Sequence, residues 1–93
     1  MAWSVQADKK RRISYVRLSG LVTYRNIREA QCALATNVYF DPAFPLLIDL
    51  RGVDELQLSA TDIYAIVTVS PVAASTRRAI LVDTLTVFGT ARL

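Results

Sequence analysis

The sequence predicts one small α/β domain, in which an N-terminal β-hairpin is followed by helix, strand, helix, strand and helix. Residues 44–64 contain a short apolar strand, a turn and a capped helix in direct succession. The later strands are separated by helical segments, so their connections must be crossovers, which are right-handed and join parallel strands. We therefore expect a mixed sheet of about four strands with the helices mainly on one face.

The hairpin is expected over residues 2–20. Apolar and polar residues alternate on both sides of a basic cluster, Lys9 to Arg12, which marks a turn between two strands. Gly20 is expected to close the hairpin, because glycine readily ends a strand. The apolar residues of the two predicted strands are Trp3, Val5 and Ala7, and then Ile13, Tyr15, Val16 and Leu18.

A first helix is expected from Thr23, as its N-cap, to about Thr36. The spacing of its apolar residues predicts one stripe facing the core. The following segment, residues 39–45, has two prolines and three aromatic residues, which suits a connection held on the core by its rings. The apolar stripe comprises Tyr24, Ile27, Leu34 and Val38, and the other side carries Arg25, Arg28, Glu29 and Cys32.

The next strand is expected from Leu46 to Leu50, ending at Gly52. A second helix then starts at Ser59, because Ser59 and Asp62 have the spacing of a capping box, and it ends before Pro71. Asp62 is its one charged residue, and its apolar stripe is broader than one sheet face needs.

A further buried strand over residues 79–82 and a third helix from Asp83 or Thr84 complete the expected order. That last helix has no Gly, Asn or Pro to end it at Leu93. We therefore treat residues 1–93 as a single domain that could lack a C-terminal strand and helix.

Composition limits the classes of function. The chain is 53% hydrophobic with a mean hydropathy of +0.31, which suggests that a partner, a ligand or further chain covers some apolar surface. The longest uncharged run, residues 63–76, has 14 residues and contains Pro71, so no membrane span is expected. The N-terminus lacks a secretory signal and there is one cysteine, which favours the cytoplasm.

Enzymatic chemistry is disfavoured. The chain has no histidine, which removes His-based triads and His metal sites. The carboxylates at 49–62 each have an ordinary structural reason and match no calcium loop, so neither a catalytic site, a metal nor a cofactor is expected. Paired catalytic carboxylates are the alternative. Cys32 is interpreted as a neutral surface or interface cysteine, with a reactive thiol as the alternative.

The net charge of +3 is only mildly basic, so nucleic-acid binding is not expected. The cluster of residues 9–12 could contact phosphate or an anionic membrane, but its place between two strands favours a solvated hairpin turn. Arg51, Arg77 and Arg78 lie near strand ends, where open α/β sheets bind ligands, and they are candidate anion contacts if they are not solvated or paired with acids.

Six segments of the chain occur in an informative order and spacing: residues 18–20, 40–42, 49–53, 58–63, 77–80 and 88–92. Together they resemble the STAS-like superfamily, named for sulfate transporters and anti-anti-sigma factors, and in particular its small bacterial members of unassigned function. The likeness covers most of the chain.

The resemblance implies a regulatory module that binds other proteins. In anti-anti-sigma factors the helix that corresponds to the second helix here begins at a phosphorylatable serine, against which a kinase docks. Ser59 lies at or next to that position, but residues 57–60 read Gln-Leu-Ser-Ala in place of the family's Asp-Ser-Ser-Gly. An ordinary cap therefore stands beside phosphorylation as an explanation of Ser59.

Two functions follow as hypotheses. The first is a non-enzymatic interaction or regulatory module, expected to form a homodimer and to bind a regulatory protein, through Ser59, Asp62, Tyr64, Ile66 and Val69. The alternative is a domain that binds a small apolar ligand or lipid, because some relatives of the fold resemble CRAL-TRIO lipid-transfer proteins. The candidate pocket residues for this alternative are Tyr39, Phe40, Phe44, Tyr64 and Phe88.

Overall fold

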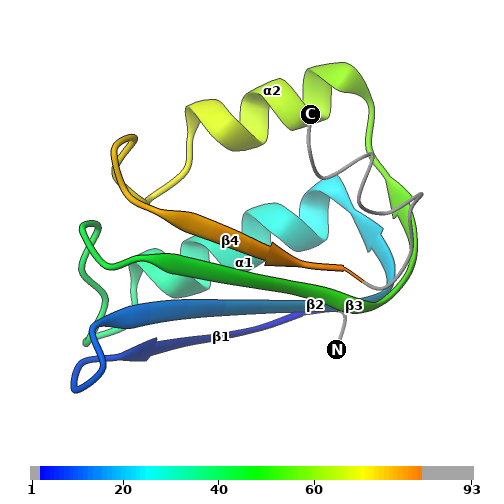
Figure 1. The fold of residues 1–93 in the computed structure, drawn as a ribbon. Helices are drawn as coiled ribbons and strands as arrows, with labels where there is room; N and C mark the ends of the chain where they lie inside the picture. The colour runs from blue at the N-terminus through cyan, green and yellow to red at the C-terminus, as the bar shows by residue number, and fades with distance from the viewer. Residues whose placement is uncertain (1–2, 83–93) are drawn as a thin grey trace.

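The computed structural model describes residues 3–82 and has an α/β fold with four strands and two helices (Figure 1). The predicted hairpin, helix, strand, helix and strand are all present in the predicted order. The expected burial of the last strand is wrong, because residues 78–81 are exposed. The expected third helix, with Phe88, lies outside the described residues. The elements are β1 (Trp3–Asp8), β2 (Ile13–Thr23), α1 (Tyr24–Ala35), β3 (Leu46–Gln57), α2 (Ala60–Thr68) and β4 (Arg78–Leu81).

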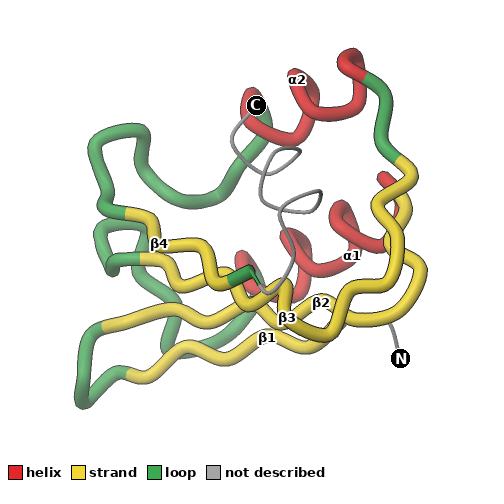
Figure 2. The backbone as a smooth tube through the Cα atoms, turned by 45° about the vertical axis from the view of Figure 1, so that its right-hand side comes forward, coloured by secondary structure: helices red, strands yellow, loops and turns green. Residues whose placement is uncertain are grey.

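The sheet is mixed, as expected. Its strand order is β1-β2-β3-β4, with β1 antiparallel to β2 and with parallel pairing between β2 and β3 and between β3 and β4. Both helices lie on the same side of this sheet in the two views (Figures 1 and 2). This side follows from the hand of the crossovers, because each helix joins two adjacent parallel strands.

Strand β2 is longer than predicted. Gly20 does not end it: the strand continues to Thr23, and Gly20 has a φ of 67°, which glycine adopts without steric cost. The pairing with β3 shifts between Gly20 and Leu21, so a local irregularity absorbs this conformation. The prediction of a strand end at Gly20 was wrong because glycine marks a bulge here.

Strand β3 is also longer than predicted and runs through Gly52 to Gln57. Glycine fits this position because β2 approaches β3 closely here, not because the chain turns. A Cβ atom at Gly52 would lie 3.2 Å from the Cβ of Ser19 on β2. The strand end predicted at Gly52 was therefore wrong, since the missing side chain allows β2 and β3 to stay paired there.

Helix α1 begins as predicted. The backbone N–H of Asn26 donates to Oγ1 of Thr23 at 3.3 Å, and the N–H of Thr23 donates to Oδ1 of Asn26 at 2.9 Å, which completes a capping box. Val38 was wrongly placed on the apolar stripe, because the helix ends at Ala35 and Val38 is 85% exposed.

The core lies between the sheet and α1. Helix α1 packs against β1 and β2, and buries Ala30 and Leu34. No residue of α2 is buried, so this helix contributes little to the core although it lies on the same side. The buried clusters are formed by Leu18, Val22, Leu50 and Val53, and by Leu34, Leu46 and Val72.

Candidate functional site

The start of α2 is fixed by the predicted capping box. The N–H of Asp62 donates to Oγ of Ser59, and the N–H of Ser59 donates to Oδ2 of Asp62, both at 3.0 Å. Each side chain therefore satisfies a backbone donor that the helix leaves unpaired. Ser59 is exposed and Asp62 half-buried, so the hydroxyl is engaged as a cap while its residue remains at the surface.

Helix α2 and the residue that follows it expose large apolar side chains, of which Val67 also lines the space between α2 and the sheet. Tyr64 is 75% exposed, Val67 is 67% exposed and Val69, just after the helix, is 47% exposed. Tyr64 and Val69 belong to the predicted interaction surface, whereas Val67 was not singled out. The sequence could have indicated Val67, because this residue belongs to the same almost uncharged helix.

Ile66 faces inward, unlike Tyr64. It lines the space between α2 and the sheet, and its main-chain oxygen accepts a hydrogen bond from Nε2 of Gln31 in α1 at 3.0 Å. That oxygen lies in the last turn of α2, where carbonyl groups lack helical partners. Gln31 therefore caps the end of α2 from the neighbouring helix.

A groove of about 630 Å³ lies between α1, α2 and the helix-covered face of the sheet. Its lining is mostly aliphatic, which is unusual for a space that opens to solvent. Both helices and the inward residues of β3 and β4 contribute to it. Representative lining residues are Ile27, Leu34, Ile48, Ile63 and Ile80.

The predicted aromatic pocket residues do not gather in this groove. Tyr39 and Tyr64 are exposed, at 55% and 75%. Phe44 is buried, and Phe40 packs against the cluster that contains Val72. None of these four candidates lines the groove, and the fifth, Phe88, lies outside the described residues.

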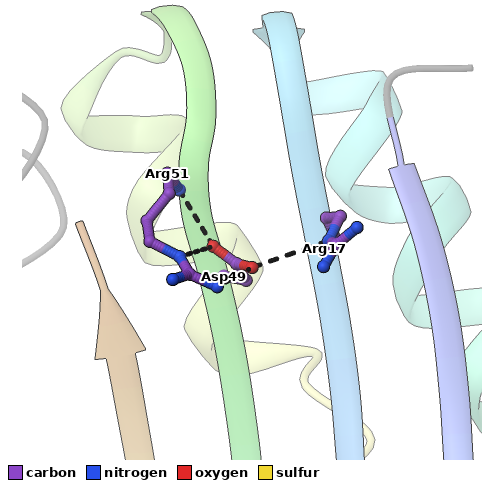
Figure 3. A network of polar contacts seen from close by, with 3 residues as sticks. All are labelled: Arg17, Asp49 and Arg51. Carbon is purple, nitrogen blue, oxygen red and sulfur yellow. Dashed lines mark hydrogen bonds and ion pairs between the residues drawn. The ribbon is translucent and has the colours of Figure 1, made fainter. Parts of the chain in front are cut away.

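The opposite face of the sheet carries a polar cluster around Asp49 (Figure 3). Nε and Nη2 of Arg51 donate to the two carboxylate oxygens of Asp49, both at 3.1 Å, and Nε of Arg17 lies 3.5 Å from Oδ2. The hydrogen bonds from Arg51 hold the pKa of Asp49 at about 2, below its usual 3.8. Arg17 was not predicted at this site; its direct pairing with Asp49 depends on strand register.

The three predicted anion contacts do not form one site. Arg51 is engaged with Asp49. Arg78 donates to main-chain oxygens of the loop before β4: Nη1 to Thr76 at 3.0 Å and Nη2 to Ala73 at 3.3 Å. Arg77 is exposed and directly precedes β4, at the end of the sheet where that strand starts.

The remaining chemistry of the described chain is sparse. Among residues 3–82 no three carboxylate or cysteine side chains gather closely enough to hold a metal ion. Cys32 is a free, exposed thiol on α1. No helix in the same range is long and apolar enough to cross a membrane.

Comparisons with protein-family models, with curated proteins and with solved structures find no significant match to this chain.

Proposed function

We propose that this chain is a non-enzymatic, STAS-like interaction module that forms a homodimer through the outer face of α2. The order of its elements supports this proposal, because a hairpin, a capped helix after a strand and parallel crossovers are what the resemblance implies. The observation that carries it is the exposed apolar surface of α2, formed by Tyr64, Val67 and Val69.

Burial of this surface in a dimer is energetically plausible. Complete burial of one large apolar side chain stabilises a complex or a core by about 1.5–3 kcal/mol. Tyr64 can also bury its ring and keep its hydroxyl hydrated, a property that makes tyrosine common in interfaces. The same face would serve a regulatory protein partner.

Ser59 is proposed as a cap and as a switch at the edge of this surface. A phosphate on Ser59 would be favoured by the positive N-terminal end of α2. It would also meet the carboxylate of Asp62, which already accepts the N–H of Ser59. Phosphorylation would therefore rearrange the capping box and add negative charge at the N-terminal end of α2.

The test is the subunit count of the purified chain. Native mass spectrometry and sedimentation equilibrium are expected to show a dimer, and Tyr64→Arg is expected to raise its dissociation constant by 100-fold or more, since such an anchor typically contributes about 3 kcal/mol. Val38→Arg is the matched control, because Val38 is 85% exposed and lies outside α2. A monomeric parent chain, or a dimer that tolerates Tyr64→Arg, would contradict the proposal.

A second function is favoured by the aliphatic groove. A small apolar ligand or lipid tail would fit its size and lining, with Ile63 and Ile66 of α2 as one wall. Native mass spectrometry should then show extra mass on the purified chain, and medium-chain fatty acids should raise its thermal midpoint. Ile63→Trp, which fills the groove, should abolish both effects; their absence from the parent chain excludes this function.

A further inference from the structure

Three connecting segments lie together at one end of the sheet. The β1–β2 turn precedes Ser14, which pairs with Leu46 at the start of β3, and Leu46 pairs with Arg78 at the start of β4. The connections before β3 and β4 therefore end beside the hairpin turn. Figures 1 and 2 show them at the left of each view, with the hairpin turn projecting furthest.

This end of the molecule is strongly basic, and we call it the basic end, defined by residues 8–12, 36–45 and 70–78. These segments contain six basic residues, in contrast to two acidic ones, Asp8 and Asp41. Strand β3 runs away from this end to residues 54–62, which contain three acidic and no basic residues. The net charge of residues 54–62 is thus opposite in sign to that of the basic end.

Most of the cations in the turn are available to a partner. Lys9, Lys10 and Arg12 are exposed and make no ion pair with residues 3–82, whereas Arg11 lies 3.9 Å from Asp8. Arg12 also has a φ of 57°, a conformation that favours glycine or asparagine. Arginine thus occupies a turn position whose positive φ is unfavourable for most residues that carry a side chain.

Apolar side chains are exposed at the same end. Val38 is 85% exposed and Tyr39 is 55% exposed. The N–H of Tyr39 donates to Oδ1 of Asn37 at 2.9 Å, and the N–H of Phe40 donates to the main-chain oxygen of Asn37 at 3.0 Å, so this tip is an ordered turn. Phe40 anchors the turn on the core, which leaves Val38 and Tyr39 directed away from it.

We propose that the basic end binds the surface of a membrane that contains anionic lipids. Clustered Lys and Arg side chains attract anionic headgroups, and an exposed aliphatic residue with a tyrosine can enter the interfacial layer. The acidic segment 54–62 lies at the far end of β3, and its repulsion from anionic headgroups favours an orientation in which the basic end faces the membrane. The proposal does not depend on α2 or its partner.

The geometry favours lipid over nucleic acid. A binder of single-stranded nucleic acid combines a basic groove along its surface with several stacking aromatics. Here the cations occupy a projecting turn, and the exposed ring of Tyr39 lies next to Val38, an aliphatic residue that cannot stack on bases.

The test is co-sedimentation of the full chain with vesicles. Binding is expected to vesicles with 30% phosphatidylserine, not to pure phosphatidylcholine, and should weaken as salt rises from 0.05 to 0.5 M. Each cation near such a surface strengthens binding by about fivefold, so Lys10→Glu should weaken it by about 25-fold. Tyr39→Ser should cause a loss of about fivefold that salt does not change, because it removes apolar contact.

Arg25→Glu is the matched control. It changes the net charge by the same amount as Lys10→Glu, but Arg25 lies in the first turn of α1, at the end of β2 away from the basic end. Its vesicle binding should stay within twofold of the parent chain, and circular dichroism should confirm that both variants are folded. Equal losses for the two variants, no preference for anionic vesicles, or tight binding to a DNA oligonucleotide without vesicle binding would each overturn the proposal.

Discussion

Nε2 of Gln31 in α1 donates a hydrogen bond to the main-chain oxygen of Ile66 in α2 at 3.0 Å. The carboxamide of Gln31 is oriented by a second contact, in which Nη1 of Arg28 donates to Oε1 of Gln31 at 2.6 Å. Because α2 buries no residue of its own, this polar contact is a principal link between the two helices. It holds α2 over the aliphatic groove.

Replacement of Gln31 by methionine should loosen α2 without unfolding the domain. Methionine has a similar size but cannot donate to Ile66, and loss of such a bond costs about 1 kcal/mol. Hydrogen exchange measured by mass spectrometry should become about fivefold faster in residues 60–70 and unchanged in β2. The neighbouring exposed substitution Cys32→Ala is the control, and equal exchange in the two variants would show that Gln31 does not secure α2.

Replacement of Arg78 by lysine should destabilise the connection between α2 and β4. The guanidinium donates to several main-chain oxygens of residues 72–76, and an ammonium group cannot reproduce that planar fork. We expect a loss of about 1–2 kcal/mol in the free energy of unfolding, measured with urea. Arg77→Lys, at an adjacent exposed residue, should change it by less than about 0.5 kcal/mol. Equal losses in both variants would show that the main-chain hydrogen bonds of Arg78 are not the cause.

Local sequence signals predicted the helix starts. Thr23 with Asn26 and Ser59 with Asp62 each form a capping box, because the hydrogen bonds involved span only three residues. The alternation around the basic cluster likewise predicted the hairpin, which forms its own contacts within 20 residues. The element order and the mixed sheet follow from these local features and from crossover geometry.

The candidate sites were less predictable, because they depend on contacts between distant segments. The continuation of β3 past Gly52 requires its close approach to Ser19, and the Arg17–Asp49 contact requires one particular register. The groove depends on where α2 lies relative to α1 and the sheet, and its lining is aliphatic. The aromatic residues chosen from the sequence therefore could not locate it. Sequence reasoning singled out Tyr64 and Val69, which are exposed, but it grouped them with Ile66, which lines the groove. It neither located the groove nor showed that Arg51 contacts Asp49.

Replacement of Ser59 by alanine should weaken the first turn of α2. It removes the acceptor for the N–H of Asp62, and loss of an N-cap costs about 1 kcal/mol. Ser59→Asp should retain the cap, because aspartate is as good an N-cap as serine. Hydrogen exchange at residues 60–63 should rise in the first variant and not in the second. Equal protection in Ser59→Ala and the parent chain would show that the cap does not stabilise α2.

Asp49 should make the stability of the domain depend on pH below about 4. Its pKa is lowered from 3.8 to about 2, first by the side-chain hydrogen bonds of Arg51 and then by the Arg51 N–H, while burial opposes the change. A carboxyl with a depressed folded-state pKa stabilises the fold above its unfolded pKa, and this contribution is lost as pH falls from about 4 to about 2.

The expected size of this effect is modest. The shift corresponds to about 2 kcal/mol, but Arg17 and Arg51 are 69% and 58% exposed, so solvent screening reduces the expected contribution to about 1 kcal/mol. Asp49→Asn should therefore lower the free energy of unfolding by about that amount at pH 6, and by almost nothing at pH 2. Urea titrations at both values measure the difference. Asp54→Asn, at an exposed carboxyl on the same strand, is the matched control. A gap for Asp49→Asn that is the same at pH 6 and pH 2 would mean that Asp49 acts through packing, because both carboxyl protonation states would then stabilise the sheet equally.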